Sequence, residues 1–164
     1  MHFIVSVGIL LFYAAFADTQ GQIQGIVRVA GSGLSQEIQI LQGENDKPSV
    51  LCPNDVAGRV KMLSAMTVQV SGIWKLDKQG QRSCLDSSEF RVLKHISGRE
   101  PFVGIFLKGK DGFFIKSEDG REHLIPEVPK GLGKMEGKKV IIDGKFMTTS
   151  NRKVLKVVSY GEYP

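Results

Sequence analysis

The chain has 164 residues, of which 41% are hydrophobic and 24% are charged. These proportions are ordinary for a globular protein and argue against an intrinsically disordered chain. The net charge of +5 at neutral pH is modest, and it falls short of the density of basic residues expected of a dedicated nucleic-acid-binding protein.

An uncharged apolar segment, FIVSVGILLFY, begins at Phe3, and AFA at 15–17 has the small-x-small pattern that signal peptidases accept. The run from Phe3 to Ala17 is shorter than the roughly 20 residues of a membrane-spanning helix. We therefore expect a signal peptide over 1–17, a mature chain that begins at Asp18, and a periplasmic or secreted protein. A short membrane anchor is the alternative, since no Lys or Arg precedes the apolar run. No later segment is apolar enough to span a membrane.

The first half of the mature chain contains five segments typical of β-strands. They alternate apolar and polar residues, are rich in β-branched side chains, and are separated by turn-forming residues. The predicted strands cover 23–31, 37–41, 49–53, 67–76 and 89–96. Between the third and fourth, apolar residues at helical spacing allow a turn or two of helix within 55–66. Gly72 stands inside the fourth strand, where a glycine indicates a bulge or a sharp coil.

The second half repeats this pattern. Its predicted strands cover 101–109, 112–117, 122–126, 138–147 and 153–160. The connector at 127–137 contains too much Gly and Pro to predict a helix. Five strands therefore follow in the same order as in the first half.

The two halves also match in sequence. MTVQVSG at 66–72 and KKVIIDG at 138–144 are alternating runs that end in Gly, and an offset of 72 residues aligns Val68 with Val140 and Gly72 with Gly144. Three further pairs of segments match in the same order along the chain. We therefore predict an internal duplication.

Five strands with a connector between the third and fourth resemble the OB-fold, a small Greek-key barrel. The runs LSAMTVQVSG and MEGKKVIIDG carry the resemblance. It implies an all-β protein of two small five-stranded OB-like barrels in tandem after a signal peptide, similar to exported bacterial OB-like proteins. The boundaries are 18–96 and 97–164, with a short seam at 95–101.

Cys52 and Cys84 are the two cysteines of the chain, and both lie in the first half. An even number of cysteines in an exported protein predicts a disulfide. The bond would close a loop of about 33 residues and contribute about 3–4 kcal/mol. Cys84 lies in a predicted loop between the fourth and fifth strands. Two reduced thiols are the alternative.

Two aromatic residues, Trp74 and Phe146, occupy equivalent places past the bulge glycines. In OB-folds this end of the barrel often contacts ligands, so an aromatic ring there could stack on a base or a sugar. Plugging the barrel end is the alternative role, and the more common one for such rings.

Positive charge is concentrated in the second half. Residues 18–94 contain 9 basic and 8 acidic side chains, whereas residues 95–164 contain 13 and 9. Two loops expected at one rim of the second barrel carry most of the candidate anion-binding or partner-binding residues, which are Lys108, Lys110, Lys145, Arg152 and Lys153. Clustered cations of this kind attract acidic ligands. A solvated surface that keeps a small domain soluble is the alternative.

Motifs for catalysis are absent from the sequence. His95 and His123 belong to no metal-binding pattern, and neither a nucleophile elbow nor a phosphate-binding loop occurs. We expect no enzyme activity, no metal and no cofactor. The sequence favours a non-enzymatic binding module of the cell envelope, whose partner is an anionic polymer, a small anion or an envelope protein. A nucleic-acid-binding OB-fold protein is the alternative, although export argues against it.

Overall fold

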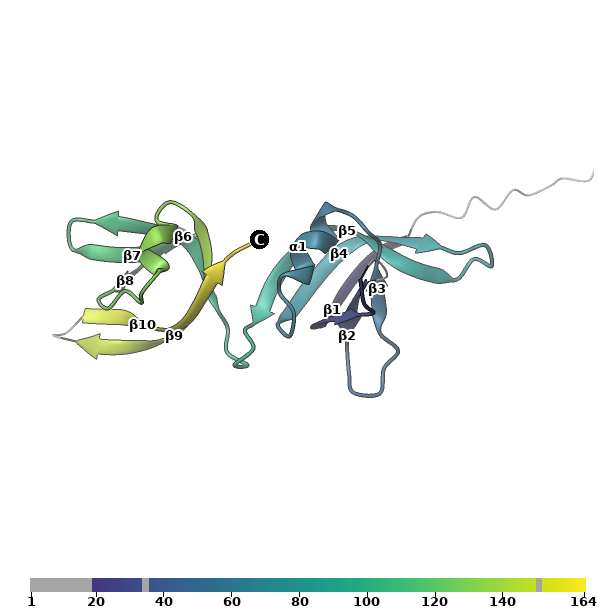
Figure 1. The fold of residues 1–164 in the computed structure, drawn as a ribbon, viewed down its shortest axis with the longest axis horizontal. Coiled ribbons are helices and arrows are strands. Elements are labelled where there is room, and N and C mark those ends of the chain that lie inside the picture. Colours follow the sequence, from purple (N-terminus) through teal and green to yellow (C-terminus); the bar gives the residue numbers. More distant parts are fainter. Residues whose placement is uncertain (1–18, 34–35, 150–151) are drawn as a thin grey trace, which may run out of the picture.

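The structure, a computed structural model, describes residues 19–33, 36–149 and 152–164. The expected signal peptide, 1–17, lies outside these residues. The described chain is predominantly β, as predicted, and forms two five-stranded units that lie side by side along the long axis of the molecule (Figure 1).

The first unit is a closed barrel with the strand order β1-β2-β3-β5-β4, in which β4 pairs back onto β1. Its elements are β1 (Thr19–Ala30), β2 (Glu37–Leu41), β3 (Ser49–Leu51), α1 (Asp55–Lys61), β4 (Thr67–Leu76) and β5 (Arg82–Lys94). All neighbouring strands are antiparallel except β3 and β5, which are parallel. The expected short helix between the third and fourth strands is therefore present as α1.

The second unit is a sheet with the order β10-β9-β6-β7-β8. Its elements are β6 (Phe102–Gly109), β7 (Gly112–Ser117), β8 (Glu122–Ile125), the 3-10 helix η1 (Leu132–Met135), β9 (Lys139–Thr149) and β10 (Arg152–Glu162). The order is that of the first unit, strand for strand. Within the described part of the chain, however, no ladder joins β8 to β10, although these two strands pack against each other.

The prediction that Cys84 lies in a loop was wrong, because β5 begins at Arg82 and contains Cys84. β4 and β5 form one long hairpin, in which Lys75 pairs with Cys84 and Leu76 with Arg82. A tight turn makes this possible: the Asp77 Oδ1 accepts hydrogen bonds of 2.9 Å from the backbone N–H groups of Gln79 and Gln81. The carboxylate satisfies two donors that a longer loop would leave to water.

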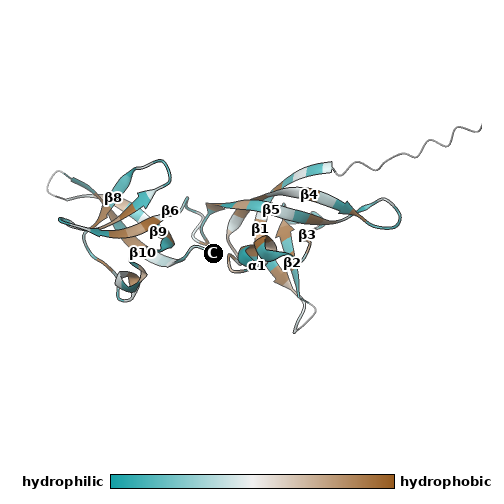
Figure 2. Cartoon of the chain, turned by 90° about the horizontal axis from the view of Figure 1, so that it is seen from above, coloured by the Kyte–Doolittle hydropathy of each residue, from teal (hydrophilic) through white to brown (hydrophobic). Residues whose placement is uncertain are grey.

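Each unit has its own hydrophobic core, and the hydrophobic residues follow the strands of both (Figure 2). As the alternation predicts, Val68 and Val70 are fully buried in the first core, and their counterparts Val140 and Ile142 are fully buried in the second. Gly72 lies at a register shift between β4 and β5, so the predicted bulge is present. Its counterpart in the second unit, Gly144, also lies beside a register shift, which falls between Val157 and Ser159 of β10.

Two further glycines allow the first strand of each unit to pair with two neighbouring strands. β1 pairs with β4 up to Ile26 and with β2 from Ile26 onward, so Gly25 lies at the change of partner. A Cβ atom there would lie 2.2 Å from the Leu41 carbonyl oxygen, and one at Gly104 of β6 would lie 2.2 Å from the Lys116 carbonyl oxygen. Only glycine tolerates so close an approach of two backbones.

The seam between β3 and β5 closes the first barrel with little backbone pairing. The parallel ladder contains one pair, Leu51 and Leu85, and the Cys52 N–H adds a 2.9 Å hydrogen bond to the Leu85 carbonyl. The predicted disulfide between Cys52 and Cys84 is present across this seam, with 5.1 Å between the two Cα atoms. The covalent bond therefore reinforces the shortest ladder of the barrel.

Asn54 extends the same seam to the helix. Its side-chain oxygen accepts a 2.8 Å hydrogen bond from the Ala57 N–H and so caps the first turn of α1. Its amide nitrogen donates to the Asp86 carboxylate and to the Ser87 carbonyl, each at 2.8 Å. One side chain thus fixes α1 against β5.

The segment between the units is held by an ion pair between a partly exposed arginine and a buried carboxylate. Arg99 donates two hydrogen bonds to the Asp143 carboxylate of β9, at 2.8 and 2.6 Å, and the His95 Nδ1 lies 3.7 Å from the same group. Asp143 is only 2% exposed. The Arg99 guanidinium holds the pKa of Asp143 below its ordinary value. The residues before β6 therefore lie across the outer face of β9, whose residues 140–144 are buried on both faces.

We expect the double variant Cys52→Ser/Cys84→Ser to lose about 3–4 kcal/mol of the free energy of unfolding, because the disulfide restricts the conformations open to the unfolded chain. Urea unfolding followed by circular dichroism measures this loss. Wild-type protein in a reducing agent should show the same loss. Equal stability of the oxidised wild type and the double variant would contradict the role given to the seam.

We expect Asp143→Asn to lower the free energy of unfolding by about 2–3 kcal/mol at neutral pH, since it breaks a charge pair with one buried partner. The lowered pKa means that ionised Asp143 stabilises the fold above about pH 4, where an unfolded Asp is ionised. This contribution is lost as the pH falls through the folded-state pKa. The stability difference between wild type and variant should therefore shrink below about pH 4.

Urea unfolding at a series of pH values provides the measurement for Asp143→Asn. Asp46→Asn, a change at an exposed carboxylate in the loop after β2, is the matched control and should alter stability by less than about 0.5 kcal/mol. A constant difference between wild type and Asp143→Asn down to low pH would show that ionisation of Asp143 is not the cause.

Candidate ligand-binding sites

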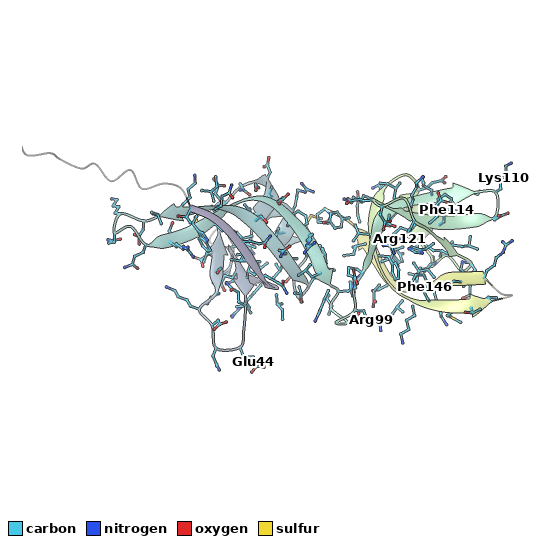
Figure 3. All side chains as sticks on the ribbon, turned by 180° about the vertical axis from the view of Figure 1, so that it is seen from behind. Glu44, Arg99, Lys110, Phe114, Arg121 and Phe146 are labelled. Carbon is cyan, nitrogen blue, oxygen red and sulfur yellow. A yellow bond between two sulfur atoms is a disulfide. The ribbon has the colours of Figure 1, made fainter. Side chains whose placement is uncertain are left out.

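A depression of about 600 Å³ lies at the end of the second unit. The β6–β7 hairpin contributes Lys110, and the start of β10 contributes Arg152 and Lys153. Figure 3 shows Lys110 at the tip of its hairpin, on the end of the second unit that points away from the first barrel. We call Lys110, Arg152 and Lys153 the basic end. These three of the five candidate cations are brought together by the fold.

The other two candidate cations lie outside this depression. The Lys108 Nζ lies 5.7 Å from the centre of the Phe113 ring, so this side chain covers an aromatic of its own hairpin. Lys145 pairs in register with Lys156 across β9 and β10 and is exposed. The basic end therefore consists of fewer residues than the sequence suggested.

The positive charges that line the depression are only partly balanced by nearby carboxylates. Asp111 and Glu122 also line it, and Glu122 forms an ion pair of 3.6 Å with Lys116. Within the described residues, the side chains of Lys110 and Arg152 have no hydrogen-bond or ion-pair partner. Two exposed cations thus face the same depression with one unpaired carboxylate beside them.

The two candidate stacking residues have different surroundings. Trp74 is 8% exposed and packs in the core of the first barrel, where its indole ring lies against Gly21 and the Arg82 guanidinium lies 5.1 Å from its centre. Phe146 is 39% exposed. Of the pair, Phe146 alone presents a ring to solvent.

Phe146 belongs to an aromatic cluster of the second unit. Its ring lies edge-on to Phe102 and to His123, with 5.1 Å between the ring centres in both cases. The Lys153 Nζ lies 3.9 Å from the centre of the Phe146 ring, which is within the range of a cation–π interaction. Burial lowers the pKa of His123, with smaller contributions in the same direction from Arg121 and Lys153. The histidine is therefore held in its neutral form near pH 7.

A second and larger depression, about 810 Å³, lies between the two units. Phe90 of β5 stacks on Tyr163 with 5.7 Å between ring centres, and the Arg59 guanidinium lies 5.1 Å from the Phe90 ring. The aromatic cluster of Phe102, His123 and Phe146 lines the opposite wall. We call this depression the cleft.

Sequence reasoning missed the cleft because its walls come from segments far apart in the chain. Phe90 lies within β5 and Tyr163 directly follows β10, and neither position gives a sign of a partner in the other unit. The aromatic side chain at each of these two positions was the one available signal, and it is a weak one.

The described residues contain no group of three or more His, Cys, Asp or Glu side chains arranged to hold a metal ion. A search of the same residues finds no helix with the length and apolar character needed to cross a membrane. No protein-family model, curated protein or solved structure matches the chain. Any conclusion on function therefore depends on the two depressions and their chemistry.

We expect Phe146→Ala to raise the pKa of His123 toward its ordinary value, because burial is the largest cause of the lowered pKa and Phe146 covers one side of the imidazole. A proton NMR titration of the imidazole resonances measures it. Met147→Ala, at the neighbouring exposed residue of β9, is the matched control and should leave the pKa unchanged. An unchanged pKa in Phe146→Ala would show that other residues bury His123.

Proposed function

We propose that this protein is an exported, non-enzymatic binding module of the cell envelope, built from two OB-like units, and that the basic end binds an anionic polymer or an acidic protein. The basic end carries the proposal. It brings Lys110 and Arg152, two exposed cations without side-chain partners among the described residues, to one depression. An anion bound there would relieve the repulsion between them.

The strand order supports the OB-like assignment. An OB-fold is a five-stranded Greek-key barrel, and the first unit is a closed five-stranded barrel with α1 between β3 and β4. The second unit has the same strand order with η1 in the place of α1. It differs because no ladder joins β8 to β10 among the described residues, so it would be a partly open member of the same type.

The disulfide supports export. Disulfides persist in oxidising compartments such as the periplasm and the extracellular medium, and they are rare in the cytosol of most organisms. The bond between Cys52 and Cys84 agrees with the apolar amino-terminal segment and its AFA motif. A periplasmic or secreted location is the proposal that accounts for both features.

A nucleic-acid-binding function is the alternative, and one observation favours it. Phe146 is partly exposed and has Lys153 over its ring, so an aromatic surface lies next to the basic end. Single-stranded nucleic acids bind to such combinations of cations and stacking surfaces. Export and the small number of aromatic residues near the basic end argue against it.

The test compares two double variants of equal charge change. Lys110→Ser/Arg152→Ser removes two cations of the basic end, and Lys47→Ser/Lys78→Ser removes two from exposed loops of the first barrel. Fluorescence anisotropy measures the binding of labelled polyphosphate, a sulfated oligosaccharide and a single-stranded DNA oligonucleotide at several salt concentrations. We expect the first variant to weaken binding of a polyanion about tenfold, equal to about 1.4 kcal/mol. The slope of log affinity against log salt should fall by about 2, one unit for each cation removed.

The control variant should bind almost as well as the wild type. Equal losses of affinity in both variants would mean that net charge alone governs binding, and the assignment of the binding site to the basic end would be wrong. Preferential binding of the oligonucleotide, abolished by Phe146→Ala, would favour the nucleic-acid alternative instead.

A further inference from the structure

The outer face of the first barrel carries a groove that continues into the cleft. A depression of about 670 Å³ and another of about 400 Å³ both include Gln22, Ser71 and Glu89. The second of these shares Phe90 and Arg91 with the cleft. The three depressions therefore form one continuous surface, which we call the long groove. It follows β5 from Asp86 to Val92 before it enters the cleft, a distance of about 20 Å for a strand.

Amide and hydroxyl side chains line the part of the long groove on the barrel. Register pairing sets Gln22 of β1 beside Ser71 of β4 and Ser71 beside Glu89 of β5. The Gln22 Nε2 donates a 3.3 Å hydrogen bond to the Ser71 Oγ. Gln20, Gln69 and Ser88 complete the polar lining. Each amide can both donate and accept hydrogen bonds, as a ligand rich in hydroxyl or acetamido groups requires.

Small residues lie in the strands beneath the groove. Gly21 and Gly72 face each other in the β1–β4 ladder, and Ser87 follows on β5 as the partner of Gly72. A Cβ atom at Gly72 would lie 2.2 Å from the Asp86 carbonyl oxygen. The glycines are therefore required by the close approach of the strands, and the place of a Cβ at Gly21 is filled by the Trp74 ring of the core.

The cleft adds aromatic surface at one end of the long groove. Phe146, 39% exposed, lies in the cluster with Phe102 and His123, and the pair of Phe90 and Tyr163 lies on the opposite side. Aromatic rings with a few placed polar groups are the usual composition of sites for small organic ligands. The apolar C–H face of a sugar ring packs on such a ring while its hydroxyl groups remain free to bond with amides.

The charge of the long groove disfavours polyanions. Its lining contains three cations, Arg91, Arg121 and Lys139, and five carboxylates, Asp86, Glu89, Glu100, Glu118 and Asp119. Most of the cations are already engaged, since Arg121 pairs with Asp119 and Lys139 with Glu118. A nucleic acid or another polyanion would be repelled, so this surface differs in kind from the basic end.

The backbone beneath the groove also disfavours an extended peptide. The N–H and C=O groups there are used in the ladders that join β1 to β4 and β4 to β5. A peptide that binds by strand addition needs a free strand edge. Side chains that anchor a peptide need apolar pockets, and the barrel part of the groove offers mainly amides, hydroxyls and carboxylates, with Ile73 as its exposed aliphatic side chain.

We propose that the long groove binds a linear, uncharged glycan, with the chain lying along β5 and one or more sugar rings packed against the aromatic cluster in the cleft. The site adjoins the basic end where Lys153 lies over the Phe146 ring, but it does not depend on the function proposed for the basic end.

The experiment uses isothermal titration calorimetry with β1,4-linked hexasaccharides of N-acetylglucosamine and of glucose as probes. At least one should bind the wild type, and its affinity should not change with salt, because no charge pairing is involved. Gln22→Ala/Gln69→Ala should weaken binding at least tenfold, and Phe146→Ala should weaken it as well. Gln79→Ala/Gln81→Ala, in the exposed β4–β5 turn, removes the same groups away from the groove and should have no effect.

Amide NMR spectra of the wild type provide a second readout, since the side-chain amide resonances of Gln22 and Gln69 should shift when the hexasaccharide is added. Lys110→Ser/Arg152→Ser should bind the hexasaccharide as the wild type does. The glycan proposal can therefore hold even if the basic end is shown not to bind anions. The proposal is overturned if neither hexasaccharide binds, or if the groove variants bind as well as the control variant. It is also overturned if an uncharged extended peptide shifts the same amide resonances and the sugars do not.

Discussion

The first barrel depends on how its seam between β3 and β5 is closed. One ladder pair, Leu51 and Leu85, is too little backbone pairing to join two strands, and the bond between Cys52 and Cys84 supplies the missing constraint. In the second unit, Ile125 occupies the place of Cys52 and the described residues form no ladder between β8 and β10. The same strand order therefore gives a barrel closed by a ladder in one unit and, in the other, a sheet whose end strands β8 and β10 pack together without one. His123 of β8, Phe146 of β9 and Lys153 of β10 meet in this second unit.

The ion pair between Arg99 and Asp143 has a similar role for the connection between the units. A buried carboxylate is costly unless its hydrogen bonds are satisfied, and Arg99 satisfies both oxygens of Asp143. This requirement holds the segment before β6 against β9. The stacked rings of Phe90 and Tyr163 add a contact at the other side of the cleft. The walls of the cleft are thus fixed by two specific interactions, and the cleft itself stays open to solvent.

The two proposed sites have opposite electrostatic character. The basic end offers unpaired cations at the far end of the second unit, whereas the long groove carries more carboxylates than cations and is lined by amides. The two proposals therefore assign an acidic partner and an uncharged polymer to different surfaces of one chain.

The features that the sequence determined by itself are those that depend on local pattern. Alternation identified Val68, Val70 and their counterparts as core residues, Gly72 marked a bulge, and an even number of cysteines predicted the disulfide. The start of β5 was missed, because a strand rich in Ser, Asp and Glu is stabilised by pairing with β4 rather than by its own hydrophobic pattern. Tertiary structure alone decided the pair of Arg99 and Asp143, the stack of Phe90 on Tyr163, and the choice of Lys110 and Arg152 over Lys108 and Lys145. These contacts join residues far apart in the chain, and the residues around each of them give no local sign of the partner.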